Sequence, residues 1–197
     1  MSLFKKFDPK VDVASSTAVK SSVQRGMRNK LLETYPALSE NDGALLEQIW
    51  PKKEPITLVK FSREHVQMLV YKGEVLFFQH FDEPYLPSLK VLHRYPFLLP
   101  SVQVDRGAIR FLLSGANIMS PGLVSAGGKL PDPSAGETAL DIGQGVAVRA
   151  QGKEEIVAVG LMKMSSEEIR KTGKGIGVDN IHYIGDDLWL TLARGGL

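Results

Sequence analysis

Two arginines on one short predicted helix are the side chains in this sequence best suited to a definable chemistry, namely contact with phosphate. Asp105 can cap a helix by accepting a backbone N–H bond in its first turn. Arg106 and Arg110 then lie one turn apart, on a different face of the helix from its apolar residues. Those apolar residues are Ala108, Ile109, Leu112 and Leu113. Guanidinium groups presented in this way supply salt-sensitive contacts to nucleic-acid phosphates.

The residues that follow this helix predict a sharp change of chain direction. Gly115 is where a residue in the left-handed conformation would end the helix. Ala116 to Met119 then read as a short extended segment, which the turn pair Pro121-Gly122 ends. A capped helix, a Gly stop, a strand and a Pro-Gly corner therefore follow one another within residues 105–122.

Other patterns that could carry chemistry are better explained by structure. Gly173-Lys-Gly-Ile-Gly177 lacks the context of a nucleotide-binding loop, because a strand and not a helix is expected after it. The four histidines have no repeated ligand spacing, and Asp186-Asp187 reads as a solvated turn. No Ser or Lys has a recognisable activating partner. The sequence therefore predicts a binding protein without a catalytic residue, a metal or a cofactor.

The composition is that of a globular protein, and it permits a reducing compartment. The chain has 197 residues, enough for two domains, with 43% hydrophobic and 23% charged residues. It has no cysteine, which excludes disulfides and thiolate-bound zinc within the chain. No apolar run approaches the roughly 20 residues of a membrane span, and the N-terminus lacks the apolar core of a signal peptide. We expect a soluble, cytoplasmic protein.

Positive charge is concentrated at the front of the chain, although the net charge is only +2. Residues 1–35 hold seven Lys or Arg against three acids. A helix capped at Ser15, Ser16 or Thr17 is expected to end before Pro36, with Lys20, Arg25 and Arg28 on its solvated face. A second short helix is expected at 41–50, three strands at 56–61, 65–71 and 74–81, and a final helix at 88–95. This predicts a small α+β domain over residues 1–96, joined to the next by a rigid, apolar junction at 96–100.

Residues 97–197 predict a small closed β-barrel with many short strands and glycine turns. Strands are expected at 138–142, 145–150, 155–164, 181–184 and 188–192, with one helical turn after Ser165 or Ser166. Residues 130–137 read as a loop rich in Pro, Ser and Gly. Residues 194–197 are expected to be a frayed end.

The 105–122 stretch resembles the opening of the PUA domain, a small RNA-binding β-barrel. The family pattern is an acidic residue, Gly-Ala, an apolar helix, Gly-Ala and Pro-Gly, found here at Asp105, 107–108, 115–116 and 121–122. A second block also matches, at 157–160, 165–169, 174–177 and 181–183. Two blocks in order at domain spacing make the resemblance specific.

The resemblance extends over nearly the whole chain. Phe4-Lys-Lys-Phe7, Pro51-Lys-Lys53, the segments 73–78 and 92–96, and Leu113-Ser-Gly-Ala-Asn-Ile-Met119 are similar to the malignant T-cell-amplified sequence family, whose fungal members are called translation-machinery-associated. This implies an α+β fold in which a small N-terminal α/β pre-PUA domain packs on a C-terminal PUA β-pseudobarrel.

The resemblance also implies which residues bind RNA. PUA domains grip RNA along the groove between the first helix, the following Gly-Ala loop and the neighbouring strands, where small residues permit close approach. The implied RNA-binding residues are Arg106, Arg110, Gly115, Ala116, Asn117, Pro121, Gly122, Lys129, Lys163 and Lys174. For each glycine, turn geometry alone is an equally good explanation.

The implied function is that of a non-enzymatic translation factor on the small (40S) ribosomal subunit. Such a factor would act with density-regulated protein, which carries a SUI1-type domain, in tRNA release, post-termination recycling and reinitiation. Its partners would be rRNA, with the tRNA acceptor end as a further candidate. Trp50, Phe77 and Phe78 are candidate anchors for the protein partner. Alternatives are an RNA-binding accessory for tRNA or rRNA modification or ribosome biogenesis, and a protein adaptor that has lost its RNA site.

Overall fold

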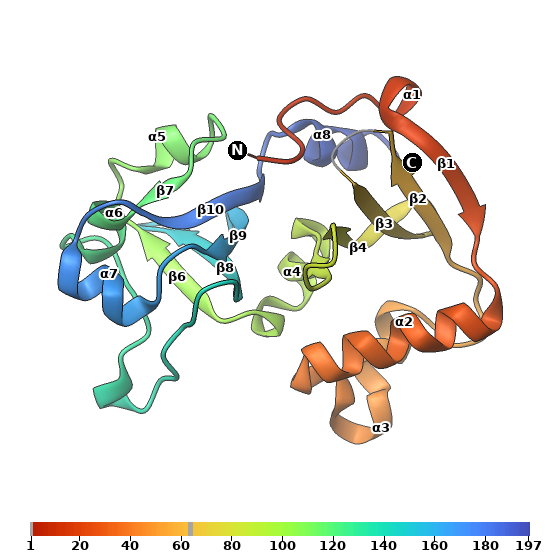
Figure 1. Cartoon of the computed structure of the whole chain (residues 1–197), viewed down its shortest axis with the longest axis horizontal. Coiled ribbons are helices and arrows are strands. Elements are labelled where there is room, and N and C mark those ends of the chain that lie inside the picture. Colours follow the sequence, from red (N-terminus) through yellow and green to blue (C-terminus); the bar gives the residue numbers. More distant parts are fainter. Residues whose placement is uncertain (1, 63–64) are drawn as a thin grey trace. The chain divides into compact units, whose positions relative to one another are not determined.

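The computed structural model of this protein describes residues 2–62 and 65–197, which form two compact units (Figure 1). The N-terminal unit contains residues 7–98 and 190–197, and the C-terminal unit contains residues 2–6 and 99–189. The chain passes between units after Leu98, two residues from the predicted boundary. The two ends of the chain depart from the predicted domains. Residues 2–6 belong to the C-terminal unit, and residues 190–197 belong to the N-terminal unit. The tail is also not frayed, since the backbone N–H of Leu197 donates to the carbonyl of Gly73 at 3.0 Å.

The N-terminal unit is built on an antiparallel sheet in the order β1-β2-β3-β4-β5. Its strands are β1 (Val13–Ala18), β2 (Thr57–Phe61), β3 (Val66–Tyr71), β4 (Glu74–His80) and β5 (Leu86–Pro87). The predicted hairpin is present, with Lys72 and Gly73 both at positive φ in its turn. β-Branched and aromatic side chains favour these strands because they pack well on a pleated surface.

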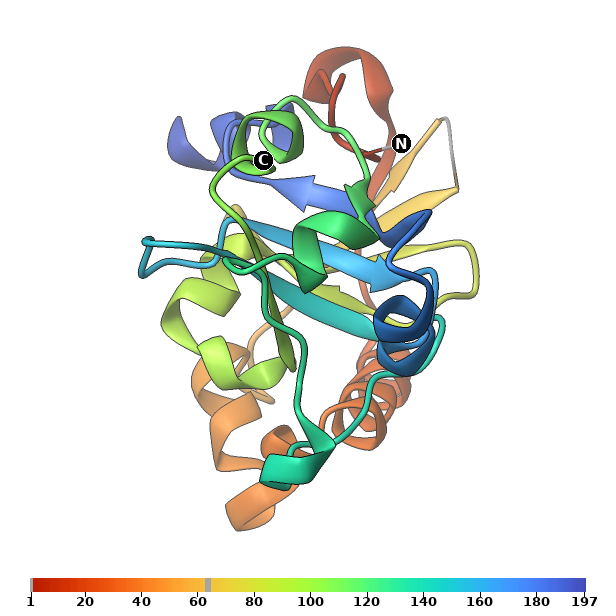
Figure 2. The same cartoon turned by 90° about the vertical axis from the view of Figure 1, so that its left-hand side faces the viewer.

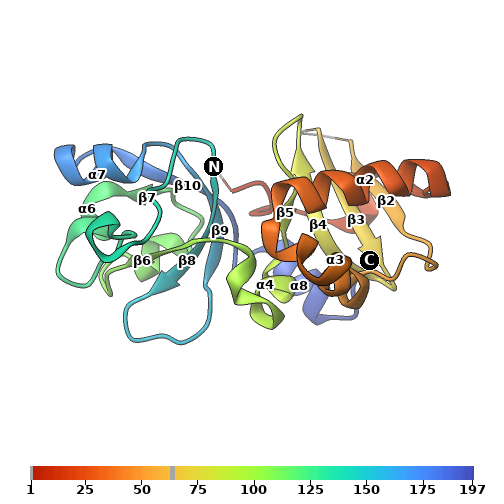
Figure 3. The ribbon, with the colours of Figure 1, turned by 90° about the horizontal axis from the view of Figure 1, so that it is seen from below.

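Helices cover one face of this sheet, as Figure 3 shows for α2 and α3. The helical elements are α1 (Pro9–Asp12), α2 (Ser21–Thr34), α3 (Pro36–Ile49), α4 (Leu89–Arg94) and the 3₁₀ turn η1 (Pro96–Leu98). Tyr35, between α2 and α3, fixes them to the sheet. Its ring lies 6.2 Å from that of Phe77, and its hydroxyl donates to the carbonyl of Tyr85. Burial raises the pKa of the Tyr35 hydroxyl, which therefore stays protonated.

The expected start and orientation of the first long helix are wrong. Residues 13–18 form β1, in which Ser16 pairs with Val59, and the helix begins only at Ser21. Ser and Thr can cap a helix, but a strand partner more than 40 residues away overrides that local preference. Within α2, Val23 is 49% exposed whereas Arg28 is buried. The predicted polar face therefore includes a side chain that packs inside the unit.

The three proposed partner anchors are core residues. Trp50 and Phe77 are completely buried and Phe78 is 1% exposed. An anchor must present its ring to a partner. As a correction to the sequence interpretation, a protein partner of this unit would have to contact other residues.

The C-terminal unit is a five-stranded sheet, curled into a half-barrel, in the order β6-β8-β9-β10-β7. Its strands are β6 (Ser101–Val104), β7 (Ile118–Met119), β8 (Gly145–Ala150), β9 (Ala158–Met162) and β10 (Ile176–Tyr183). Figure 2 looks onto this unit, with β8, β9 and β10 side by side. The pair β6–β8 is parallel and the other pairs are antiparallel.

Short helical elements connect these strands or follow the last one. They are α5 (Ile109–Leu112), α6 (Ser120–Val124), the 3₁₀ turn η2 (Pro133–Ala135), α7 (Ser166–Thr172) and α8 (Asp187–Ala193). Of these, α5 and α6 border the candidate site. Ser165 caps α7 as expected, accepting from the N–H of Glu168 at 3.1 Å. The predicted corner at Pro121-Gly122 is instead the first turn of α6, where Pro fits because its missing N–H has no helical partner.

Two predicted strands are absent from the described chain. Residues 138–142 are irregular, and the predicted strand 188–192 lies in α8. The carboxylate of Asp186 explains the helix, because it accepts from the N–H of Trp189 at 2.8 Å, as an N-terminal cap does. The same carboxylate accepts from the N–H of Tyr183 at 3.0 Å. Asp186 is therefore a buried structural residue and not the solvated turn acid that the sequence suggested.

Candidate nucleic-acid interface

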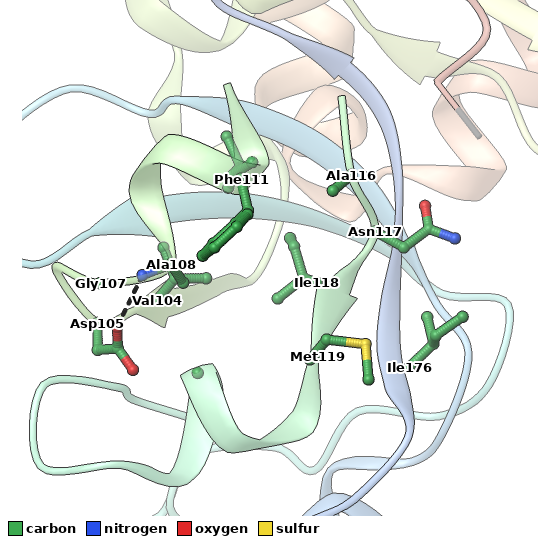
Figure 4. Close-up of a pocket in the computed structure, with 12 residues that line it drawn as sticks. Val104, Asp105, Gly107, Ala108, Phe111, Ala116, Asn117, Ile118, Met119 and Ile176 are labelled. Atoms are coloured by element: carbon green, nitrogen blue, oxygen red, sulfur yellow. Dashed lines mark hydrogen bonds between the residues drawn. The ribbon is translucent and has the colours of Figure 1, made fainter. Parts of the chain in front are cut away.

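A groove of about 540 Å³ opens in the C-terminal unit between α5, β7 and the start of β10. Figure 4 shows its lining, with Phe111 on one wall and Met119 and Ile176 on the other. The other lining residues are Val104, Asp105, Gly107, Ala108, Leu112, Ala116, Asn117, Ile118 and Gly122. The groove thus lies within the stretch that the sequence singled out, with one wall added by β10.

The walls of this groove are apolar and open to solvent. Phe111 is 53% exposed, Met119 50% and Ile176 39%. Large apolar side chains that gather in one exposed patch commonly mark a binding surface. Flat aromatic rings of this kind stack on nucleobases, and do so with little dependence on sequence.

Arg110 adds a cation directly beside the aromatic wall. Its guanidinium carbon lies 4.6 Å from the centroid of the Phe111 ring. An arginine held over a ring by a cation–π contact keeps its N–H donors free for a phosphate. The groove therefore combines a surface for stacking with a positive charge at its edge.

Asp105 closes the groove at the start of α5, and its carboxylate is fully engaged. One oxygen accepts from the N–H of Ala108 at 2.9 Å, in the turn before α5, whose own N-cap residue is Ala108 and has no side-chain cap. The other accepts from the hydroxyl of Ser125 at 2.7 Å. The Ser125 hydroxyl first, and then the backbone N–H groups of Ala108 and Gly107, hold the pKa of Asp105 below its ordinary value. An ionised carboxylate already bonded to its own chain ties α5 to α6 and is poorly placed to act as a base.

The Gly-Ala loop is held in place from the neighbouring strand. Gly115 has φ +85°, so its conformation alone explains the glycine. The buried side chain of Asn180 donates to the carbonyls of Leu112 and Ala116, both at 3.0 Å. The Asn180 side chain on β10 therefore bonds the end of α5 and the loop that follows it.

Asn117 takes part in the same network. Its amide nitrogen donates to Asp179 at 2.9 Å, and its amide oxygen accepts from the N–H of Asn180 at 3.0 Å. Lys163 reaches the same carboxylate, with its ammonium 3.5 Å from Asp179. Lys163 is thus connected to the groove through Asp179 and Asn117, and its side chain is 61% exposed.

The structure does not bring every predicted cation to the groove. The backbone N–H of Arg106 bonds Gln151, and its guanidinium lies beside Gly152 in the β8–β9 turn. Lys129 forms an ion pair with Glu137 at 3.5 Å and borders a different hollow, along β6. Lys174 and Pro121 are exposed near α6 but do not line the groove. Contact of these four residues with RNA stays a prediction.

Sequence reasoning missed the apolar lining. Phe111 was omitted because it falls outside the predicted core stripe, although an aromatic residue on the solvent side of a short helix is itself a signal. Met119 and Ile176 could not be paired from the sequence, since 57 positions separate them. They meet because Met119 pairs with Ile176 across β7 and β10.

The described residues offer neither a metal centre nor a membrane span. Across residues 2–62 and 65–197, no three His, Asp or Glu side chains come together as a metal site would require. Within the same ranges, no helix has the length and apolar character needed to cross a membrane.

Both parts of the chain match known domain families. Residues 7–96 match the Pre-PUA-like domain and residues 100–184 match the PUA domain. In fold, the chain resembles a hypothetical protein from Pyrococcus horikoshii OT3, with a TM-score of 0.66 and 19% identity over 90% of this chain and 99% of that one. It also resembles a PUA domain protein from Aeropyrum pernix K1, with a TM-score of 0.64 and 24% identity over 92% and 91% of the two chains.

Curated relatives are similar along almost their full length. The chain is 46% identical to translation machinery-associated protein 20 of Schizosaccharomyces pombe over 96% of this chain and 99% of the relative. It is 48% identical to malignant T-cell-amplified sequence 2 of Homo sapiens over 95% and 97%. Similarity of this degree from end to end shows that the protein belongs to the malignant T-cell-amplified sequence family, with a Pre-PUA-like domain followed by a PUA domain.

Proposed function

We propose that this protein is a non-enzymatic translation factor that binds the small (40S) ribosomal subunit by gripping RNA in the groove between α5, β7 and β10. The observation that carries the proposal is the exposed Phe111 ring with Arg110 over it, at the edge of an apolar groove. The protein belongs to a family that includes a translation machinery-associated protein, which supports an RNA of the translation machinery as the ligand.

The groove fits an unpaired nucleotide better than a duplex. A base can stack on Phe111 only when it is free of its own stacking partners, as in a loop, a bulge or a strand end. The phosphate of that nucleotide would then lie near Arg110. Such sites occur in rRNA and at the tRNA acceptor end, both of which are partners in this proposal.

The groups that line the groove favour binding over catalysis, because none of them is placed to act as a catalytic acid or base. Among the described residues that line the groove, Asp105 is the only acidic one, and it is already bonded to Ala108 and Ser125. In this account the protein works in the cytoplasm with density-regulated protein. The pair would release deacylated tRNA from post-termination small subunits and so permit recycling and reinitiation.

Sedimentation with purified small subunits across a salt series tests the proposal, with and without density-regulated protein. We expect co-sedimentation that weakens steeply as salt rises, because phosphate contacts release counterions. Phe111→Ala should reduce the bound fraction at every salt concentration. Absence of the wild-type chain from the subunit fraction, with the partner present, would contradict the proposal. Recovery of an RNA-modification enzyme instead would favour the accessory role.

A further inference from the structure

A second hollow, in the N-terminal unit, has the character of an anion site. It lies between α2 and α3, has a volume of about 370 Å³, and is here called the α2–α3 cleft. Its polar lining residues include Arg25, Arg28, Asn29, Asp42 and Lys52. We propose that this cleft binds a phosphodiester of the RNA backbone and so gives the protein an RNA contact outside its PUA domain. This inference rests on the proposed function, which makes RNA the partner.

Arg28 forms the fixed floor of the cleft. It is 7% exposed, and its guanidinium donates to Glu47 and to the carbonyl of Trp50. The guanidinium carbon also lies 5.1 Å from the centroid of the Trp50 ring. These bonds use two of the five N–H donors of the guanidinium. A guanidinium held in this way does not have to be ordered when an anion arrives.

The rim of the cleft carries two cationic side chains that form no strong ion pair within the described chain. Arg25 is exposed and forms no ion pair with any residue that the structure describes. The side chain of Lys52 is 70% exposed, and its ammonium lies 3.8 Å from Glu47 at the limit of an ion pair. Such an exposed pair is worth little, so Lys52 is available to a ligand.

Acidic neighbours decide which anion fits. Glu47 offsets the charge of Arg28, and Asp42 also lines the cleft. The remaining net charge of about one cation is enough to attract and neutralise the single charge of one phosphodiester. The exposed amide of Asn29 adds a neutral group that can bond a phosphate or ribose oxygen.

The backbone beside the cleft is in an unusual conformation. Asn41, Asp42 and Gly43 have φ values of 49°, 55° and 79°, so three consecutive residues are left-handed. For a residue other than glycine this conformation costs about 1–2 kcal/mol, and such runs are rare. Here the run interrupts α3 and places Asp42 and Gly43 against the cleft. Strain of this kind gathers at functional sites, which agrees with the proposal.

A matched pair of double variants tests the cleft in the full-length chain. Arg25→Gln with Lys52→Gln removes two rim cations, while Lys10→Gln with Lys30→Gln removes two exposed cations of the same unit that lie outside the cleft. Fluorescence anisotropy with an RNA hairpin carrying a single-stranded overhang gives the affinity at several salt concentrations. All four side chains are solvent-exposed, so the melting temperature of both variants should match that of the wild type.

The cleft variant should bind RNA about tenfold more weakly at 0.1 M salt, with a salt slope lower by about 0.7–0.9, the value of one phosphate contact. The Lys10 and Lys30 variant should stay close to wild type. An equal loss in both variants would reduce the effect to general charge and overturn the inference. A cleft variant that binds RNA normally but loses binding to phosphatidylserine vesicles would overturn it in favour of lipid.

Phe111→Ala separates failure of this inference from failure of the proposed function. If Phe111→Ala weakens RNA binding and the cleft variant does not, the cleft inference is wrong and the groove stands. If the wild-type chain does not bind the RNA, both ideas fail together.

Discussion

The guanidinium of Arg110 lies over the ring of Phe111, 4.6 Å from its centroid, although neither side chain is buried in the core. Two neighbouring residues thus present a ring and a charge at one edge of the groove. A ring restrains the guanidinium beside it, which lowers the entropy lost when a phosphate binds. This pair leads to two predictions that separate stacking from charge.

Phe111→Ala should weaken binding to single-stranded RNA by about 5- to 150-fold, which corresponds to about 1–3 kcal/mol for one stacked base. The slope of affinity against salt should not change, since no charge is removed. Anisotropy titrations at several salt concentrations measure both quantities. Leu113→Ala is the control, because Leu113 is 40% exposed at the end of the same helix but does not line the groove. Equal losses in the two variants would argue against stacking.

Charge reversal at Arg106 and Arg110 together should weaken binding to the small subunit and flatten its salt dependence. Neutral variants of each arginine alone show how much each contributes to the salt dependence. Arg110→Gln should lower the salt slope by about 0.7–0.9, the value of one phosphate contact. Arg106→Gln should do less, because that guanidinium lies beside Gly152 and not at the groove. A filter assay in which neither variant alters affinity or slope would place both arginines outside the RNA footprint.

Asp105→Asn should destabilise the protein at neutral pH, and the difference from wild type should shrink in acid. Hydrogen bonds from Ser125 and Ala108 depress the pKa of Asp105 in the folded state. A depressed pKa contributes stability above the ordinary carboxyl pKa, and this stability is lost as pH falls through the lower folded value. Melting temperatures of both proteins from pH 7 to pH 3 measure the effect. A constant gap across that range would show that the charge of Asp105 is unimportant.

Gly128→Ala should disrupt the C-terminal unit, with a loss of about 3 kcal/mol or more in the free energy of unfolding. An added Cβ would lie 2.4 Å from the carbonyl carbon and oxygen of Leu123 in α6, and backbone atoms cannot move aside cheaply. Gly143→Ala is the matched control. At φ +80° but with no atom within 4 Å, it should lose only about 1 kcal/mol from backbone strain. Denaturant unfolding of the two variants gives the comparison, and equal losses would exclude the close approach as the cause.

The parts of the fold that depend on local chemistry could be predicted from the sequence. Gly115 has the left-handed conformation predicted for it, and Asp105 bonds the N–H three residues on in the turn before α5, because each role is set by residues within one turn. The two-domain organisation followed from the resemblance over nearly the whole chain. The hairpin around Gly73 followed from the alternation of strand and turn residues.

The errors arose where distant residues decide the outcome. Residues 13–18 became a strand because β2 lies beside them, and Arg28 is buried because Glu47 and Trp50 satisfy it. Trp50, a candidate partner anchor, lies in the core. The apolar wall of the groove was missed because Met119 and Ile176 meet only through pairing of β7 with β10. Sequence spacing contains no information about such pairings.

Ultraviolet crosslinking of the protein bound to small ribosomal subunits, followed by mass spectrometry of the attached peptides, tests the central claim most directly. The account predicts that nucleotides attach within residues 105–122, with Phe111 as the principal site, and that Phe111→Ala removes this crosslink. Crosslinks confined to the hollow along β6, around Lys129 and Arg149, with residues 105–122 unmodified, would contradict it.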